Sequence, residues 1–213
     1  MSFYKNIKTI HLDILKEIGN IGAGHAATAL SSLLNRKIDM KVPDVRVASF
    51  DEMIDLAGGA EYVAVSVFLR IDGDAKGSMF FVLPLEQATY FVQKITGDDA
   101  FSFTTPPCSE LGLSAMQEVG NILSGSYLSA LSDFTGLNLY PSVPELSVDM
   151  VGAMISFGLI EISQLSDFVI VIDTALKEMD VSANEAIKGH FFLLPDPEAF
   201  QIIFRSLGVP LNE

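Results

Sequence analysis

Residues 13–43 read DILKEIGNIGAGHAATALSSLLNRKIDMKVP, and residues 114–144 read SAMQEVGNILSGSYLSALSDFTGLNLYPSVP. Both stretches carry one polar pattern, in which an Asp or Ser is followed by Glu, Asn and Pro at fixed spacing. The pattern consists of Asp13, Glu17, Asn20 and Pro43 in the first stretch, and of Ser114, Glu118, Asn121 and Pro144 in the second. Matching positions are 101 residues apart. Core packing does not explain a polar group that recurs at fixed spacing in an otherwise apolar chain.

The repetition extends beyond these polar residues. Without gaps, ten of the 31 positions in the two stretches are identical, where unrelated stretches would share about two. Ile71-Asp72 matches Ile172-Asp173 at the same offset, and residues 81–84 match residues 192–195 at an offset of 111, as Gly97 matches Gly208. We therefore expect one domain over residues 1–213, made of two tandem repeats at about 1–103 and 108–208. Two copies are too few for a solenoid, so a pseudo-twofold unit that shares one sheet is expected.

Hydrophobic periodicity predicts long helices at residues 9–35 and 109–135, which end near Asn35 and Gly136. A capping box formed by Ser114 and Gln117 is an alternative that would start the second helix later. The remaining elements are predicted as strands at 61–71, 77–83, 151–163, 167–174 and 189–194, and as short helices at 85–96 and 197–207. Hairpins with segregated helices indicate an α+β fold, in which an antiparallel sheet is flanked by the two motif-bearing helices and the shorter ones.

Composition narrows the class of partner. The chain has 213 residues, of which 49% are hydrophobic, and its formal net charge is −14. This charge argues against nucleic acid and against anionic membrane surfaces, but it permits a protein partner with a positive patch. No apolar run approaches the length of a membrane helix, no signal-peptide pattern is present, and Cys108 is the only cysteine. A cytoplasmic protein without membrane insertion or an internal disulfide is expected.

The repeated pattern limits the chemistry that the chain can perform. Positions i, i+4 and i+7 share one helix face, so each half presents a carboxylate and a carboxamide about one turn apart. A carboxamide is not a general base, but it can orient a water molecule, and a carboxylate can pair with a lysine of a partner. The three histidines are scattered and unrepeated, and no metal cage, phosphate loop or nucleophile elbow is visible. One such pattern alone would indicate only a solvated face, whereas its recurrence favours a functional site.

Both predicted helices carry interior glycines, at Gly19, Gly22 and Gly24 in the first and at Gly120 and Gly125 in the second. Each interior glycine costs a helix about 1 kcal/mol relative to alanine. Two explanations are compatible with each other: close packing of helices within the protein, and a bare backbone that lets another protein approach the Asn.

The full pattern, present twice in a chain of this length, resembles the CheC family of chemotaxis phosphatases. All eight positions fit the family pattern, and the resemblance spans nearly the whole chain. The related CheX type carries one such site, and the flagellar-switch type FliY has further domains.

The resemblance implies dephosphorylation of the phosphorylated response regulator CheY, whose own active site supplies the phospho-aspartate and Mg²⁺. It implies that the catalytic residues are Glu17, Asn20, Glu118 and Asn121. In this scheme each Asn places the attacking water, and each Glu pairs with the active-site lysine of the partner. Asp13 and Ser114 would support the docking face. Binding of the receptor deamidase CheD is also implied, without residues assigned to it. No cofactor of the chain's own is expected.

Two alternatives stay open at this stage. The chain could be a non-catalytic scaffold that binds receiver domains, as a flagellar-switch protein of the same fold would. The Asn in both halves argues against this alternative, because binding alone does not require a carboxamide. An independent enzyme acting on a small phosphate ester is disfavoured, because the sequence has no nucleophile–base pair or metal ligands.

Overall fold

The computed structural model describes residues 6–105, 107–162, 168–178 and 187–211. Both halves have the same order of elements, a long helix, two strands, a helix, a hairpin and a last helix. In the first half these are α1 (Thr9–Leu34), β1 (Ile38–Lys41), β2 (Val45–Ser49), α2 (Phe50–Leu56), β3 (Val63–Gly73), β4 (Gly77–Pro84) and α3 (Leu85–Thr96). In the second they are α4 (Glu110–Thr135), β5 (Leu139–Pro141), β6 (Glu145–Met150), α5 (Val151–Ile162), β7 (Phe168–Glu178), β8 (Ile187–Pro195) and α6 (Pro197–Ser206).

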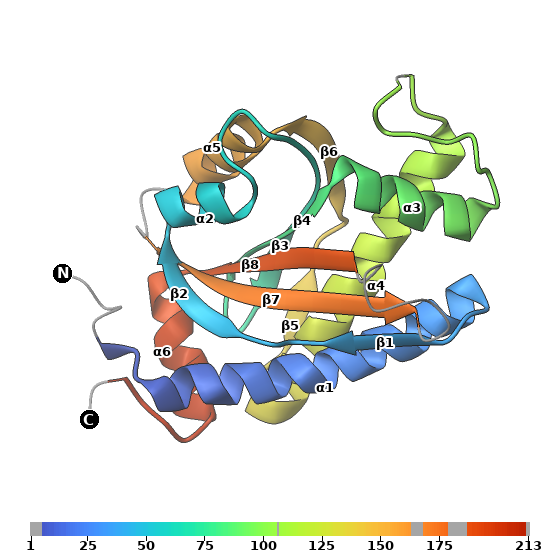
Figure 1. The fold of residues 1–213 in the computed structure, drawn as a ribbon. Helices are drawn as coiled ribbons and strands as arrows, with labels where there is room; N and C mark the ends of the chain where they lie inside the picture. Colours follow the sequence, from blue (N-terminus) through green and yellow to red (C-terminus); the bar gives the residue numbers. More distant parts are fainter. Residues whose placement is uncertain (1–5, 106, 163–167, 179–186, 212–213) are drawn as a thin grey trace.

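The strands form one eight-stranded sheet whose order reads the same from both ends. The order is β1-β7-β8-β4-β3-β5, with β2 also paired to β7 and β6 also paired to β3. All of these pairs are antiparallel. Exchanging the two halves converts each pair into its counterpart, with the twofold axis between β4 and β8. The predicted α+β fold with a duplicated, pseudo-twofold antiparallel sheet is therefore confirmed (Figure 1).

The two halves exchange their edge strands. Strands β1 and β2 belong to the first half but pair with β7 of the second, and β5 and β6 of the second half pair with β3 of the first. At the centre, Phe80 lies opposite Phe192 and Phe81 opposite Phe191. The cross-strand aromatic pairs join the halves by burying large apolar surfaces in the middle of the sheet.

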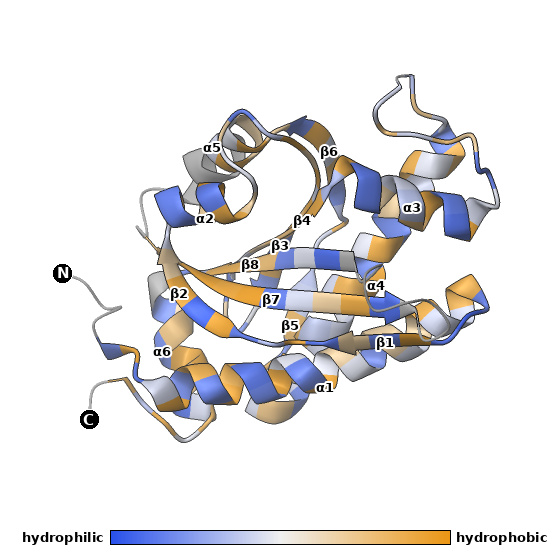
Figure 2. Ribbon diagram, viewed as in Figure 1, coloured by the Kyte–Doolittle hydropathy of each residue, from blue (hydrophilic) through white to orange (hydrophobic). Residues whose placement is uncertain are grey.

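Helices cover both faces of the curled sheet. Helices α1 and α4 pack against each other on one face, where α3 and α6 complete the larger apolar core. Helices α2 and α5 lie together on the opposite face over a smaller core (Figure 1). Consecutive residues of β7 alternate between the two cores, Ile170 and Ile172 facing one and Val169 and Val171 the other. Strand β7 is therefore apolar on both faces over residues 169–172, and it is largely orange in Figure 2.

The two long helices begin and end at equivalent positions. Helix α1 is followed by Asn35, whose φ is 49°, and α4 by Gly136, whose φ is 68°. Both are left-handed C-caps, a conformation that Gly and Asn tolerate best. Helix α4 starts after Ser109, whose hydroxyl accepts a hydrogen bond from the N–H of Gly112. The alternative start at Ser114 is wrong, because Ser109 already caps the helix one turn earlier.

The glycines of these helices have two different surroundings. A Cβ added at Gly22 would lie 3.0 Å from Cα of Tyr127 and 3.1 Å from the carbonyl oxygen of Ser126. Glycine at this position therefore allows the backbones of α1 and α4 to approach closely. In contrast, a Cβ at Gly24 or Gly125 would meet nothing within 4 Å. The close-packing explanation is therefore confirmed at Gly22, and the approach of another protein along the bare surface at Gly24 and Gly125 stays a prediction.

The strand predicted at residues 151–163 is wrong. The strand lies just before it, at β6, and residues 151–162 form helix α5. Residues 145–150 read ELSVDM, in which polar and apolar side chains alternate as in a strand with one solvated face. Helix α5 begins at Val151, 101 residues after α2 begins at Phe50. Its β-branched and aromatic composition suggested a strand, but its place over the second face of the sheet favours the helix.

The match of Ile71 with Ile172 is also wrong. Ile71 pairs with Pro141, whose counterpart at the offset of 101 is Met40, and Met40 pairs with Leu176. The offset between the halves has therefore already grown to 105 at β3 and β7. Among the described residues, no helix is both long enough and apolar enough to cross a membrane.

Candidate functional site

The predicted site residues lie on the outer faces of α1 and α4. Asp13 and Glu17 are exposed and Asn20 is half-buried, and in the second half Ser114, Glu118 and Asn121 are all exposed. Each long helix packs with its neighbouring face against the sheet and the other helix. The prediction that each set shares one helix face is confirmed, and this face lies away from the core.

In the first half, the side chain of Asn20 is bonded to the connection between β1 and β2. Its Oδ1 accepts a hydrogen bond from the N–H of Val42 at 3.0 Å. Its Nδ2 donates to the carbonyl oxygen of Lys16 at 3.0 Å and lies 3.5 Å from that of Val42. Both ends of the carboxamide are therefore engaged by the chain itself.

The connection between β1 and β2 is closed onto α1 as a result. The side chain of Val42 is only 2% exposed. It packs over Gly19, where an added Cβ would lie 3.3 Å from Cγ2 of Val42. Because Gly19 has no side chain, the side chain of Val42 can pack against α1 at this point. The hydrogen bonds of Asn20 to the main chain of Val42 hold the connection in this position.

In the second half, the corresponding connection between β5 and β6 is open. Val143, the counterpart of Val42, is 82% exposed. The carbonyl oxygen of Val143 accepts a hydrogen bond from Oγ of Ser142 at 3.1 Å, and that of Pro144 accepts one from Nε2 of Gln117 at 3.2 Å. Ser142 is itself bonded to Arg70 of β3 through its N–H and its hydroxyl. The connection is therefore held without the help of Asn121.

The open connection leaves a hollow beside the polar face of α4. It has a volume of about 470 Å³ and is lined by Ser114, Gln117, Glu118, Asn121, Pro141, Ser142, Val143 and Pro144. Within the part of the chain that the structure describes, the side chain of Asn121 makes no hydrogen bond. Its carboxamide can therefore bond to a molecule that enters the hollow. The three polar residues predicted for the second half, Ser114, Glu118 and Asn121, therefore line one cavity.

Sequence reasoning missed the residues that make the two sites different. Gln117 stands where the first half has Lys16, and Ser142 stands where it has Lys41. These positions lie inside the repeated stretches, so the differences could have been read from the alignment of the two copies. The hydrogen bond between Asn20 and Val42 had no such signal, because it depends on how the connection folds back.

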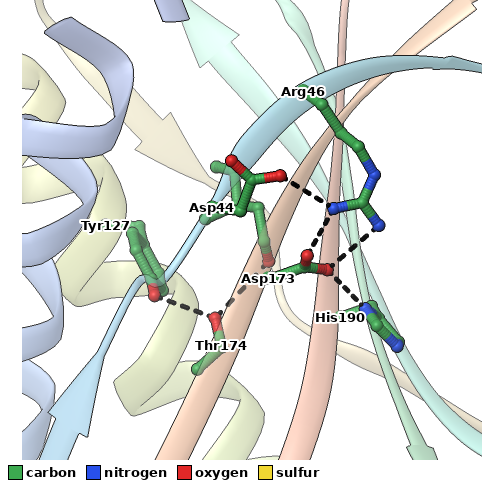
Figure 3. A network of polar contacts seen from close by, with 7 residues as sticks. Asp44, Arg46, Tyr127, Asp173, Thr174 and His190 are labelled. Carbon is green, nitrogen blue, oxygen red and sulfur yellow. Dashed lines mark hydrogen bonds and ion pairs between the residues drawn. The ribbon is translucent and has the colours of Figure 1, made fainter. Parts of the chain in front are cut away.

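A polar cluster lies on the opposite face of the sheet, away from both sites. The carboxylate of Asp173 accepts hydrogen bonds from Arg46, which also contacts Asp44, and Nδ1 of His190 lies 2.8 Å from Oδ1 of Asp173 (Figure 3). Burial raises the pKa of Asp173, but hydrogen bonds and charge from Arg46 and His190 outweigh it and leave the pKa below its usual value. These contacts tie β2 of one half to β7 and β8 of the other.

The neighbouring residue of β7 points to the other face. Thr174 lies 3.1 Å from the hydroxyl oxygen of Tyr127, which packs between α1 and the sheet (Figure 3). Burial raises the pKa of Tyr127, and the hydrogen bond to Thr174 opposes this only in part. Tyr127 is therefore a neutral packing residue.

The histidines and the cysteine do not form a site with the motif residues. His11 is buried, with Nδ1 accepting from the N–H of Lys8 at 2.8 Å and Nε2 lying 3.0 Å from the carbonyl oxygen of Val209. His25 is exposed, and Cys108 is half-buried. In residues 6–105, 107–162, 168–178 and 187–211, no three His, Cys, Asp or Glu side chains are grouped to hold a metal ion.

Comparison with known proteins agrees with the duplicated pattern. The sequence profile of the CheC-like family matches residues 10–47 and 111–148, two segments that are again 101 residues apart. The chain is 49% identical to the CheY-P phosphatase CheC of Bacillus subtilis over 211 residues, which is 99% of this chain and 100% of that protein.

Solved structures show the same fold at low identity. Thermotoga maritima FliY superimposes with a TM-score of 0.73 at 22% identity, covering 95% of this chain and 98% of that one. The CheX–CheY–BeF₃–Mg²⁺ complex of Borrelia burgdorferi gives a TM-score of 0.50 at 16% identity, covering 82% and 96%. With near-complete coverage at 49% identity and two profile matches centred on its twin helices, the chain belongs to the CheC-like family.

Proposed function

We propose that this protein is a phosphatase that hydrolyses the phospho-aspartate of the response regulator CheY. The proposal is supported by the relative that bears this activity in its name and is 49% identical over its entire length. It is supported equally by the site, because an exposed Glu and Asn one turn apart can act on a phosphoryl group held by another protein. The partner would supply the phospho-aspartate and its Mg²⁺.

The chemistry requires little from the phosphatase beyond positioning. Phosphoryl transfer proceeds through a transition state whose charge is spread over the phosphoryl oxygens, so aligning the attacking water accounts for much of the rate. The carboxamide of Asn121 can accept a hydrogen bond from the water through Oδ1 and donate to the phosphoryl group through Nδ2. It thereby fixes the water in line with the bond to be broken.

Glu118 has the complementary role of fixing the register of the partner. Its carboxylate is exposed one turn before Asn121 and can pair with the active-site lysine of the receiver domain. Ser114 lies one turn further along the same face and lines the same hollow. In the first site, Glu17 and Asp13 would act in the same way, with Asn20 placing the water.

The observation that carries the proposal is the unbonded Asn121 in a hollow beside Glu118. Asn20, in contrast, is bonded to Val42 of its own chain. For this reason the second site is the better prepared of the two. The first site requires Asn20 to leave Val42 before its carboxamide can reach a water.

The test is the rate of phosphate loss from phosphorylated CheY with the native protein, Asn20→Ala, Asn121→Ala and the double variant. We expect acceleration by the native chain, a larger loss with Asn121→Ala than with Asn20→Ala, and no acceleration by the double variant. Asp133→Ala, at an exposed position of α4 outside the motif, is the matched control. No acceleration by the folded native protein would overturn the proposal, and binding without hydrolysis would point to a scaffold.

The proposal also includes binding to the receptor deamidase CheD and a cytoplasmic location, where response regulators act. Both are supported by family membership and not by particular residues. Calorimetric titration with purified CheD tests the binding. The double Asn variant is the control: if CheD binds away from the phosphatase face, this variant should bind CheD as the native protein does. A titration without heat, and without co-elution in gel filtration, would contradict it.

A further inference from the structure

We propose that Gln117 is a positioning residue of the second site, because it tethers the β5–β6 connection and so leaves Asn121 free to act. In the first site, Asn20 itself makes the tether. The expected effect on the dephosphorylation rate rests on the proposed phosphatase function. The geometry of the tether can be tested in the free protein.

The two connections are held at different main-chain groups and by different side chains. At the first site the N–H of Val42 donates to Asn20 at 3.0 Å, and its carbonyl oxygen lies 3.5 Å from the amide nitrogen of Asn20. At the second site the carbonyl oxygen of Val143 is bonded to Ser142 and that of Pro144 to Gln117. Asn121 is left with no part in holding the connection.

The residue at position i−4 from each Asn differs between the two sites. Gln117 has a neutral amide that can donate to a main-chain carbonyl at the edge of the hollow. The ammonium group of Lys16, at the matching position, is strongly hydrated and favours water over such a contact. The hydrogen bond from Ser142 to the carbonyl oxygen of Val143 also has no equivalent in the first half. The residue at the matching position is Lys41, which has no hydroxyl group to donate to the neighbouring carbonyl.

Without the tether of Gln117, the second connection would close as the first has done. Asn121 would then bond to Val143 in the manner of Asn20 and Val42, and the hollow would lose its reactive amide. One hydrogen bond of ordinary net strength shifts such an equilibrium about two- to tenfold. The observed rate per site should fall by up to that factor, because only the open form can place a water and the rate follows the open fraction.

The experiment isolates each site by removing the Asn of the other. In the Asn20→Ala background, Gln117→Met keeps the length of the side chain but cannot donate a hydrogen bond. We expect dephosphorylation of CheY to fall measurably, by up to about tenfold. The matched control is Lys16→Met in the Asn121→Ala background, which removes no tether and should leave the remaining rate unchanged.

The second readout is hydrogen exchange of two amides in the free protein, measured by NMR. In the native chain the N–H of Val42 should exchange slowly and that of Val143 rapidly. In Gln117→Met, exchange at Val143 should slow toward the value for Val42, which a loss of stability alone would not produce. Unchanged exchange at Val143, or an unchanged rate of dephosphorylation in a folded variant, would overturn the assignment.

The two readouts also separate this inference from the proposed function. If the native protein fails to dephosphorylate CheY, the phosphatase proposal falls, whereas the contrast between Val42 and Val143 still reports on the tether. If dephosphorylation is normal and the exchange contrast is missing, the positioning role of Gln117 falls and the phosphatase proposal stands.

Discussion

The carboxamide of Asn20 closes onto the main chain of Val42, accepting from its N–H and lying within reach of its carbonyl oxygen. A residue that the resemblance assigns to catalysis is thereby also a structural residue. Its counterpart Asn121 has no such contact in the described chain. We therefore expect Asn20 to contribute more than Asn121 to the stability of the protein, and Asn121 to contribute more than Asn20 to its activity.

The first prediction concerns stability. Asn20→Ala leaves the N–H of Val42 without its acceptor at a position that is largely buried, and should lower the free energy of unfolding by about 1–2 kcal/mol. Asn121→Ala removes an exposed, unbonded side chain and should change it by no more than about 0.5 kcal/mol. Urea denaturation of the two variants measures both values, and equal losses would contradict the closed and open description of the two connections.

The second prediction concerns binding. Glu118→Gln removes the carboxylate that would pair with the lysine of the receiver, and should weaken binding of beryllofluoride-activated CheY about tenfold. Glu110→Gln, in the exposed first turn of the same helix, is the charge-matched control and should have no effect. Calorimetry in the Asn20→Ala background at two salt concentrations measures it. An equal change from both variants would show that only the total charge matters.

The third prediction concerns the contact between α1 and α4. Gly22→Ala places a Cβ against the backbone of α4 and should destabilise the protein by about 1–3 kcal/mol. Gly24→Ala, two residues further on and with open space around it, should instead stabilise the helix by up to about 1 kcal/mol. Thermal unfolding of the two variants gives opposite shifts if the close approach is real.

The fourth prediction concerns pH. Because the pKa of Asp173 is lower in the folded protein than in the unfolded chain, the ionised carboxylate stabilises the fold above its ordinary pKa of about 3.9. That contribution is lost as the pH falls through the lowered value. Asp173→Asn should cost about 1 kcal/mol at pH 7, a modest value since the cluster is partly solvated.

The same variant gives the pH test. The difference in unfolding free energy between the native protein and Asp173→Asn should shrink as the pH is lowered from 5 to 3. Denaturation at pH 7, 5 and 3 measures the trend. A difference that grows on acidification would mean that the carboxyl is not stabilised by Arg46 and His190 as the contacts indicate.

The long helices, the hairpins and the duplication could be predicted from the sequence because their signals are local or repeated. Asn35 and Gly136 mark the helix ends through backbone chemistry, and residues 81–84 and 192–195 recur as whole segments. The short strands on either side of Pro43 were missed, since four or five residues carry too little periodicity. Helix α5 was misread because its apolar residues fit either structure until the sheet face beneath it is known.

Helical spacing places Glu17 with Asn20, and Glu118 with Asn121, on one face of each helix. Their catalytic role stays a prediction, which rests on the repeat and on the family resemblance. The closure of Val42 onto α1 does not follow from helical spacing, because it depends on the path of a connection and on the space above Gly19.

The exchange of edge strands between the halves has a consequence for the origin of the fold. A protein of one copy could complete its sheet only by giving β1 and β2 to a second molecule and receiving the same from it, as an intertwined homodimer. Identical subunits would be bound to carry identical residues at both sites. Joining the copies in one polypeptide removed that constraint. At the matching positions Lys16 and Gln117, the two copies now carry side chains of different chemistry.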